Sequence, residues 1–172
     1  MKGNDIPRRQ NVFGGFSQDG ACVVKKNEKK NNVDLTVPEN FLHMRQDILR
    51  FADVDSNGHL NNVKFFEFCQ ESRVSLFRAV GAHDGEDGRA WMIAALSIEF
   101  LGQVHAPGNI ETGTLVLKFG NSSLKLGQGI FNSGRCAATA EMTMVRVDLQ
   151  TGKPFPIEPI LRERLKMLGG SG

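Results

Sequence analysis

One long stretch without glycine or proline, residues 63–80, follows a segment rich in Asp, Asn and Gly. Its apolar side chains recur mostly three and four residues apart, which is the period of one helix face. Asn61 or Asn62 can cap the start of a helix, and Gly81 stands where a helix C-terminus favours glycine. The pattern predicts one long helix over residues 63–80 that is buried on most of its sides.

Strand patterns dominate the sequence after this helix, in the segments 89–104, 110–119, 123–131 and 135–149. Apolar residues recur at alternate positions within them, as strands with one buried face require. Turn-forming Pro, Gly, Asn and Ser residues occupy the links, which indicates hairpins between antiparallel neighbours. Residues 41–51 add either a strand or a short helix, because the spacing of two between His43, Arg45 and Asp47 does not decide between them.

These elements predict an α+β fold, in which one long helix is the only large element available to cover an antiparallel sheet. Residues 1–36 are rich in basic residues, Asn and Gly and poor in apolar side chains, so we expect a flexible extension there. A short strand near residues 21–24 is the only regular element expected in it. One domain then spans residues 37–168, and the tail 169–172 resembles a linker.

Net charge and cysteine spacing argue against several classes of function. The formal net charge of +2 is too small to favour a nucleic acid or a membrane surface as partner. The three cysteines lack a CxxC motif and the four histidines lack ligand-like spacing, so we expect neither disulfides nor a metal site. No apolar run reaches the roughly 18–20 residues of a membrane span. We therefore expect a cytoplasmic protein.

The segment from Asp53 to Gly58 opens like a calcium-binding loop. Such a loop takes oxygen ligands from positions one, three and five, a glycine at six and a bidentate Glu at twelve. The first four requirements are met, but the twelfth position is Lys64. A cation there cannot close the coordination shell of a metal ion, so we do not expect calcium binding.

The same segment runs into the predicted helix start, which indicates a different chemistry. The N–H groups of a first helical turn lack intrahelical partners and carry a net positive field. They suit the negative charge that develops on a carbonyl oxygen under attack. A carboxylate on the preceding loop, such as Asp55, can then attack that carbonyl or activate water beside it. Asp53 is expected to hold the loop by hydrogen-bonding to its backbone.

Residues 50–62 also contain a longer pattern, Asp-x-Asp-x-x-Gly-His-x-Asn-Asn, before a Phe-rich helix that carries Glu71-Ser72-Arg73. This run resembles the hotdog-fold acyl-CoA thioesterases related to hydroxybenzoyl-CoA thioesterase. The resemblance continues through residues 120–124 and 151–154. It implies a hotdog fold, in which an antiparallel β-sheet of five or six strands wraps a long central helix. It also implies a homodimer or a dimer of dimers, with active sites at the subunit interface.

The resemblance also assigns roles to residues around the helix start. It implies that Asp55 is the catalytic carboxylate and that the backbone N–H at about Asn62 polarises the thioester carbonyl. His59 takes either a direct part in catalysis or a structural part in the loop. Some relatives carry the carboxylate on the helix instead, where Glu67 or Glu71 would be the counterpart.

The activity that the resemblance implies is hydrolysis of an acyl-CoA thioester to a free acid and CoA. Ser122, Ser123 and Lys125 are the residues expected to bind CoA, and no cofactor is expected beyond the CoA of the substrate itself. Two alternatives stay open: a hydrolase of acyl groups on acyl carrier protein, and a hotdog domain that binds acyl-CoA without turning it over. The abundance of Phe and the absence of Tyr favour an aliphatic acyl chain.

Overall fold

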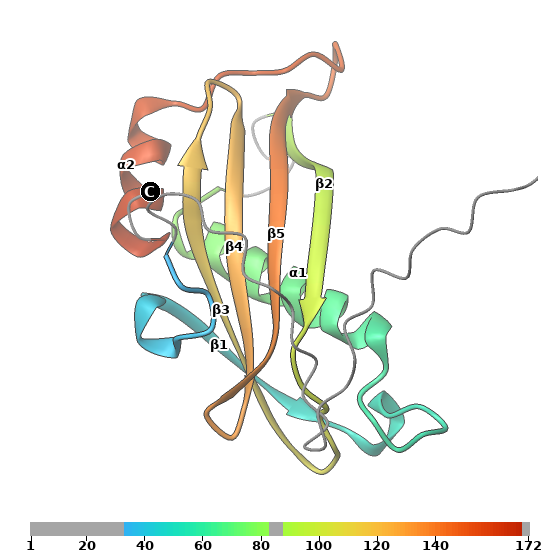
Figure 1. The fold of residues 1–172 in the computed structure, drawn as a ribbon. Helices are drawn as coiled ribbons and strands as arrows, with labels where there is room; N and C mark the ends of the chain where they lie inside the picture. Colours follow the sequence, from blue (N-terminus) through green and yellow to red (C-terminus); the bar gives the residue numbers. More distant parts are fainter. Residues whose placement is uncertain (1–32, 83–87, 170–172) are drawn as a thin grey trace, which may run out of the picture. The chain divides into compact units, whose positions relative to one another are not determined.

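Five antiparallel strands form one sheet in the computed structural model, which describes residues 33–82 and 88–169 (Figure 1). The strands are β1 His43–Leu49, β2 Arg89–Phe100, β3 Gly108–Phe119, β4 Ser123–Asn132 and β5 Arg135–Asp148. Their order is β1-β3-β4-β5-β2, so β1 and β2 are the two edges. The helices of this part are α1 Asn62–Ala79, α2 Pro159–Gly169 and the short 3-10 helices η1 Pro38–Asn40 and η2 Phe51–Asp53. The strand expected near residues 21–24 lies outside the described residues.

The observed sheet confirms the predicted strands. β3, β4 and β5 form consecutive hairpins, while β2 pairs with β5. Residues 41–51, which the sequence pattern left between strand and helix, contain β1, paired with β3. β2 ends earlier than expected, because the N–H groups of Leu101 and Gly102 both donate to the Ala137 carbonyl oxygen and leave the ladder. The chain therefore turns toward β3 soon after Phe100.

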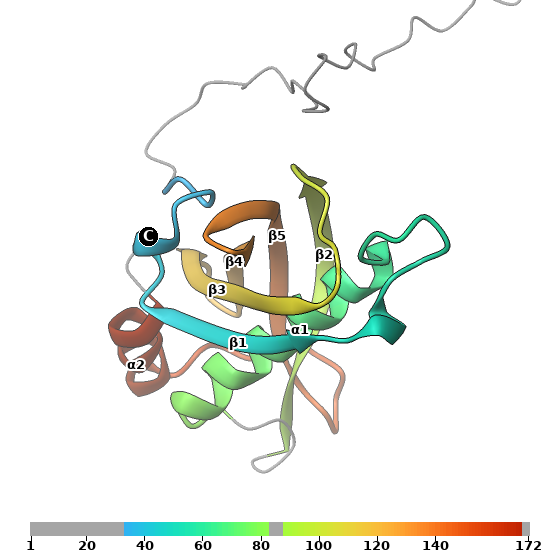
Figure 2. The ribbon, with the colours of Figure 1, turned by 90° about the horizontal axis from the view of Figure 1, so that it is seen from below.

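Helix α1 lies across one face of the sheet, as two views at right angles show (Figures 1 and 2). Its buried apolar side chains recur at helical spacing and are Phe65, Phe68, Cys69, Leu76 and Phe77. The Asn61 side chain caps the helix by accepting the Val63 N–H at 2.9 Å. Gly81, with a φ of +73°, follows the last turn. The predicted helix is therefore confirmed, with both ends shifted by one residue, but it is buried along one face and not on most of its sides, because eight of its 18 residues are exposed.

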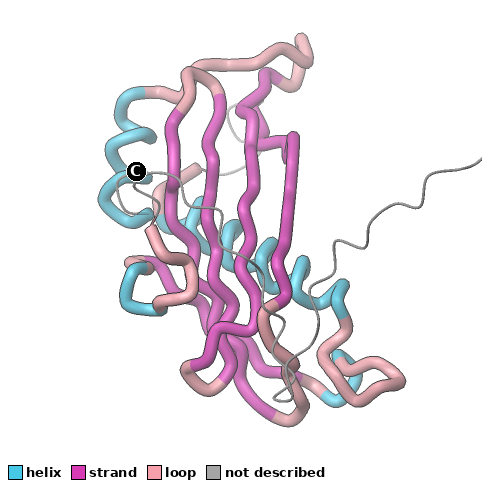
Figure 3. The backbone as a smooth tube through the Cα atoms, viewed as in Figure 1, coloured by secondary structure: helices cyan, strands magenta, loops and turns pink. Residues whose placement is uncertain are grey.

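The expectation that α1 alone covers the sheet is wrong, because α2 packs beside it against β3 (Figure 3). Leu161 and Leu165 of α2 share an apolar cluster with Leu76 of α1, with Val80 directly after α1 and with Leu126 of β4. The sequence does carry a helical spacing here, at Leu161, Leu165 and Leu168, but the prediction did not include this helix. The contact holds the C-terminal half of α1 on the sheet. No helix in the described part of the chain is long and apolar enough to cross a membrane.

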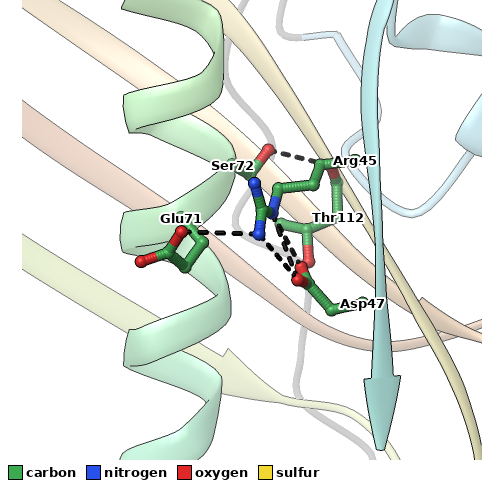
Figure 4. Close-up of polar contacts among 5 residues, drawn as sticks. All are labelled: Arg45, Asp47, Glu71, Ser72 and Thr112. Carbon is green, nitrogen blue, oxygen red and sulfur yellow. Dashed lines mark hydrogen bonds and ion pairs between the residues drawn. The ribbon is translucent and has the colours of Figure 1, made fainter.

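A buried polar seam of four residues, Ser72, Thr112, Thr114 and Gln128, lies between α1 and the middle of the sheet. Ser72 Oγ donates to the Thr112 carbonyl oxygen at 2.9 Å (Figure 4). The same oxygen lies 2.8 Å from Thr114 Oγ1. Gln128 Nε2 donates to Thr114 Oγ1 and to the Cys69 carbonyl oxygen, each at 2.8 Å. Buried polar groups that bond to one another favour a single packing arrangement. The polar seam therefore sets where α1 sits on the sheet.

Part of the opposite face of the sheet, over β3 and β4, is covered by the segment that enters β1, residues 33–41, which we call the strap (Figure 2). Its Leu35 and Phe41 side chains lie against β3 and β4 at strand positions that are glycine. A Cβ atom at Gly113 would stand 2.3 Å from the Phe41 ring, and one at Gly129 would stand 2.5 Å from the Leu35 carbonyl oxygen. Glycine at these strand positions leaves the room that the strap occupies.

His43 of β1 is a half-buried histidine beside α1. Its Nε2 atom is buried and has no hydrogen-bond partner within the described residues. Burial lowers the pKa of the imidazole from its ordinary 6.5, and a backbone hydrogen bond with Ser72 opposes this shift without reversing it. The folded protein therefore favours the neutral ring more strongly than the unfolded chain does.

Stability should depend on pH through His43. Between the lowered folded-state pKa and 6.5, the unfolded chain binds more protons at His43 than the fold does. We therefore expect the free energy of unfolding to fall as the pH drops below 6.5, measured by urea unfolding at a series of pH values. The His43→Gln chain should lose this part of the dependence. Identical pH profiles for the two chains would contradict the assignment.

Candidate active site

The loop between η2 and α1 closes on itself and carries Asp55. Val54 and Leu60 form an isolated antiparallel bridge, and the Asp55 N–H donates to the His59 carbonyl oxygen at 2.8 Å. Within this bridge the chain turns at Gly58, whose φ of +76° favours glycine. The Gly58 N–H donates back to the Asp55 carbonyl oxygen at 3.0 Å. Asp55 therefore stands in a closed turn a few residues before the helix start.

The two oxygens of the half-buried Asp55 carboxylate have different surroundings. Oδ1 accepts the N–H groups of Asn57 at 2.8 Å and of His59 at 3.3 Å. Oδ2 accepts no hydrogen bond from any residue in 33–82 or 88–169. One oxygen therefore orients the carboxylate, and the other is available to a ligand.

The start of α1 presents a backbone donor beside this turn. The Asn61 N–H donates to the Asp53 carbonyl oxygen at 2.9 Å. Asn61 also accepts two N–H groups of the first helical turn: its side chain accepts from Val63, and its carbonyl oxygen accepts from Lys64. The Asn62 N–H has no acceptor in the described part of the chain, and it lies at the positive end of the α1 dipole. A carbonyl oxygen that gains negative charge suits this position.

Asp53, the other acid of the loop, is buried and engaged at both oxygens. Oδ2 accepts the Arg50 N–H at 2.8 Å, and Oδ1 lies 3.3 Å from the Lys64 ammonium group. Lys64, which argued against a calcium loop, thus pairs with the first acid of that pattern. The expectation that Asp53 bonds to the backbone is confirmed. The two acids differ because only Asp55 keeps one carboxylate oxygen without a partner among the described residues.

His59 holds the turn through its backbone, which agrees with the structural role expected as one of its two alternatives. A direct part of His59 in catalysis stays a prediction. Its ring packs edge to face on His105, with ring centroids 4.8 Å apart. His105 belongs to the connection between β2 and β3, and its Nδ1 lies 3.1 Å from the Gly58 carbonyl oxygen. Sequence analysis missed His105, because no local pattern reports a contact that spans 47 positions.

Glu67 and Glu71, the alternative carboxylates on α1, lie on the side of the helix that faces β1. Glu67 pairs with Lys64 at 2.7 Å. Glu71 lies 3.4 Å from Arg45, which also holds Asp47 at 2.9 Å (Figure 4). Both glutamates line a groove of about 410 Å³ between β1 and α1. Each has a cationic partner, whereas Asp55 has none within the described residues.

The three residues expected to bind CoA lie at the end of the sheet that is opposite to the Asp55 loop. They are Ser122, Ser123 and Lys125. β1 ends beside the start of β3, where Leu49 pairs with Gly108, whereas the turn at Ser122 follows the end of β3 (Figure 1). The 12 residues of β3 span roughly 40 Å at about 3.3 Å each. Lys125 also pairs with Glu141 at 2.7 Å. One subunit therefore does not bring these residues to Asp55.

Cysteine offers no alternative nucleophile in the described part of the chain. Cys69 is fully buried, and burial raises the pKa of its thiol to about 12. The pKa of Cys136 is also raised, chiefly by burial. A thiol must ionise before it attacks, so both are packing residues, as expected. No group of three His, Cys, Asp or Glu side chains within residues 33–82 and 88–169 is placed to hold a metal ion.

The chain is similar to known proteins in sequence and in fold. Residues 49–165 match the sequence profile of the Thioesterase-like superfamily, a region longer than half of the chain. The uncharacterized protein YsmA of Bacillus subtilis (strain 168) is 28% identical over 108 residues, which are 61% of this chain and 72% of YsmA. The PA5185 protein of Pseudomonas aeruginosa strain PAO1 is similar in structure, with a TM-score of 0.72 and 27% identity over 79% of this chain and 97% of that one.

A second solved structure is a thioesterase of Thermus thermophilus, complexed with coenzyme A and Zn. It has a TM-score of 0.67 and 25% identity, over 77% of this chain and 97% of that one. The five-stranded sheet and its long helix match the fold that the resemblance implied. The chain therefore belongs to the thioesterase-like superfamily, as a hotdog-fold thioester hydrolase.

Proposed function

We propose that the chain is an acyl-CoA thioesterase in which the Asp55 carboxylate and the Asn62 N–H act on one thioester carbonyl. One observation carries this proposal: an acceptor and a donor, Asp55 Oδ2 and the Asn62 N–H, stand without partners among the described residues in one closed loop and helix start. A thioester supplies both partners. Its carbonyl oxygen accepts from Asn62, and its carbonyl carbon is the target of Asp55 or of water beside it.

In the proposed reaction, the Asn62 N–H stabilises the negative charge that builds up on the carbonyl oxygen. Asp55 either attacks the carbonyl carbon or takes a proton from an attacking water. The C–S bond then breaks, and CoA leaves as a thiolate that takes up a proton. On the first route, water next hydrolyses the anhydride with Asp55 and restores the free carboxylate. Both routes consume one water for each thioester.

Turnover in ¹⁸O-labelled water distinguishes these two routes. Label incorporated into Asp55 itself requires the covalent anhydride, because only its hydrolysis exchanges a carboxylate oxygen. Label that appears solely in the released acid fits water activated by Asp55, and it also fits hydrolysis of the anhydride at its acyl carbon. An acylated Asp55 peptide in a rapidly quenched single turnover then identifies the covalent route. Mass spectrometry of the peptide that contains Asp55, and of the acid, reads both sites from one reaction.

CoA is the favoured acyl carrier because the Thermus thermophilus relative is a thioesterase with coenzyme A bound. No cofactor beyond the CoA of the substrate is part of the proposal. Activity that persists after dialysis against a metal chelator would agree with this. Activity that requires an added cofactor would contradict it.

A second copy of the chain completes the proposed site. β2 is an edge strand, and its Met92, Ile93 and Phe100 side chains are 41–48% exposed. A two-fold axis pairs identical edge strands antiparallel, so the start of one β2 lies beside the end of the other. The Ser122 carbonyl oxygen accepts the N–H of Arg146 in β5, which pairs with Trp91 near the start of β2. At the other end of β2, Leu60 beside the Asp55 loop donates its N–H to the carbonyl oxygen of Val104, which follows β2. Pairing through β2 therefore brings the Ser122 turn of one copy toward Asp55 of the other.

The β2 pairing can be tested with two matched substitutions of exposed isoleucines. Ile93→Arg places a charge on the β2 edge, whereas Ile160→Arg places one on α2, where the side chain is 63% exposed. By light scattering we expect a dimer or a dimer of dimers for the wild type and Ile160→Arg, and a folded monomer without thiol release for Ile93→Arg. A monomeric wild type with full activity would contradict the proposal.

A thiol-release screen tests the activity itself. The full chain is assayed with short, medium, long and aromatic acyl-CoAs and with the same acyl groups on acyl carrier protein. Faster turnover of the CoA thioesters supports the proposal, and fastest turnover of aliphatic chains would agree with the Phe-rich, Tyr-free composition. Faster turnover of the carrier-protein thioesters favours that alternative. Acyl-CoA binding without thiol release across the panel would favour a non-catalytic binding domain.

A further inference from the structure

His105 holds the tip of the Asp55 loop from outside the loop. Its Nδ1 lies 3.1 Å from the Gly58 carbonyl oxygen, and because a carbonyl oxygen only accepts, Nδ1 carries the hydrogen. The neighbouring Val104 carbonyl oxygen accepts the Leu60 N–H at 2.8 Å. The connection between β2 and β3 therefore holds the Asp55 loop at two places. Of these, the contact from the His105 side chain lies nearer to the tip of the loop.

The Gly58 carbonyl and the His59 N–H belong to one rigid peptide plane. His105 bonds to the carbonyl side of that plane, and Asp55 Oδ1 accepts from its N–H side. Asn57, the residue before Gly58, donates the other hydrogen bond to Asp55 Oδ1 through its backbone N–H. A rotation of the plane would therefore turn a donor away from Asp55 and change the direction of its free Oδ2.

We propose that His105 is a positioning residue: it fixes the peptide plane between Gly58 and His59 and so orients Asp55 toward the thioester. This role rests on the proposed function, because it acts through Asp55 and requires no contact between His105 and the substrate. Catalysis tolerates little displacement, since a misplacement of about 1 Å costs on the order of 10²-fold in rate. A single hydrogen bond at the loop tip can therefore have a measurable effect on kcat.

Three substitutions separate positioning from general loss of structure. His105→Ala removes the donor, whereas His105→Asn keeps an amide N–H close to the place of Nδ1. Gln103→Ala is the matched control, because Gln103 is an exposed residue of the same connection. Each variant is assayed for kcat and KM with the best acyl-CoA, for its thermal unfolding midpoint, and for amide hydrogen exchange at Asn57 and His59.

We expect His105→Ala to lower kcat about 10- to 100-fold with KM changed by no more than about twofold, and to speed exchange at Asn57 and His59. His105→Asn should recover most of kcat, and Gln103→Ala should match the wild type. Unchanged exchange or unchanged kcat in His105→Ala overturns the role of His105 alone, as does an equal loss in His105→Asn. A wild-type chain that releases no thiol overturns the proposed function, and the role of His105 with it.

Discussion

Asp55→Asn should lower kcat for thiol release by about 10²- to 10⁴-fold, the usual loss when a general base or its equivalent is removed. Asn keeps an Oδ1 that accepts the N–H groups of Asn57 and His59, so the turn should stay closed. An amide neither attacks a carbonyl carbon nor takes a proton from water. The Asn62 N–H is untouched, so we expect binding to persist and KM to change little.

Glu67→Gln and Glu71→Gln are the matched controls, because they neutralise the carboxylates that α1 offers as alternatives. We expect both to retain most of the wild-type kcat, since each glutamate is exposed and pairs with a cation on the protein surface. Thermal unfolding of all three variants should resemble that of the wild type. Full activity in Asp55→Asn would refute its role, and a loss confined to one glutamate variant would move the carboxylate to α1.

Gly129→Ala should lower the free energy of unfolding by about 1–3 kcal/mol, the usual cost of overfilling a packed interior. The added Cβ would lie 2.5 Å from the Leu35 carbonyl oxygen and 2.7 Å from the Phe131 ring. Phe131 is fully buried, and a backbone oxygen cannot move aside by a side-chain rotation. The strap must therefore lift away or β4 must shift. Urea unfolding of the full chain measures the cost.

Gly102→Ala is the control for this substitution, because its added Cβ would meet nothing closer than 3.9 Å. We expect its stability to stay within about 0.5 kcal/mol of the wild type. Thiol release per folded molecule should survive Gly129→Ala, because the strap lies on the face of the sheet opposite α1. Wild-type stability in Gly129→Ala would mean that the strap is not seated against β4.

The sequence predicts those parts of the fold that local patterns determine. The helix period and its capping residues locate α1 to within one residue, and the turn chemistry locates the hairpins of β3, β4 and β5. The spacing from Asp53 to Asn62 likewise predicts a loop that runs into a helix start. The different roles of Asp53 and Asp55 depend on partners such as Arg50 and Lys64, which only the folded loop identifies.

The features that sequence analysis misses arise from contacts between distant segments. α2 depends on two leucines that become buried beside α1, and the strap depends on strand glycines that Leu35 and Phe41 cover. His105 is likewise invisible, because its significance comes from Gly58 in another loop. The contacts of the strap and of His105 have neither a periodicity nor a turn signature, whereas the leucines of α2 do recur at helical spacing. Ser122 is a different case, because the sequence does propose it as a CoA-binding residue but gives no sign that it lies at the opposite end of the sheet from Asp55.

The polar seam divides the apolar interior beneath α1 into two compartments, one on the side of α2 and one at the start of α1. The compartment on the α2 side is built around Leu76, Leu126 and Leu165, far from the loop chemistry. The other holds Leu60 and Phe65, which flank the start of α1, and only the partly buried Leu96 touches both among the described residues. A change of side-chain volume in one compartment therefore has little apolar packing through which to reach the other. A substitution in the compartment on the α2 side can accordingly change thermal stability while the Asp55 loop keeps its packing.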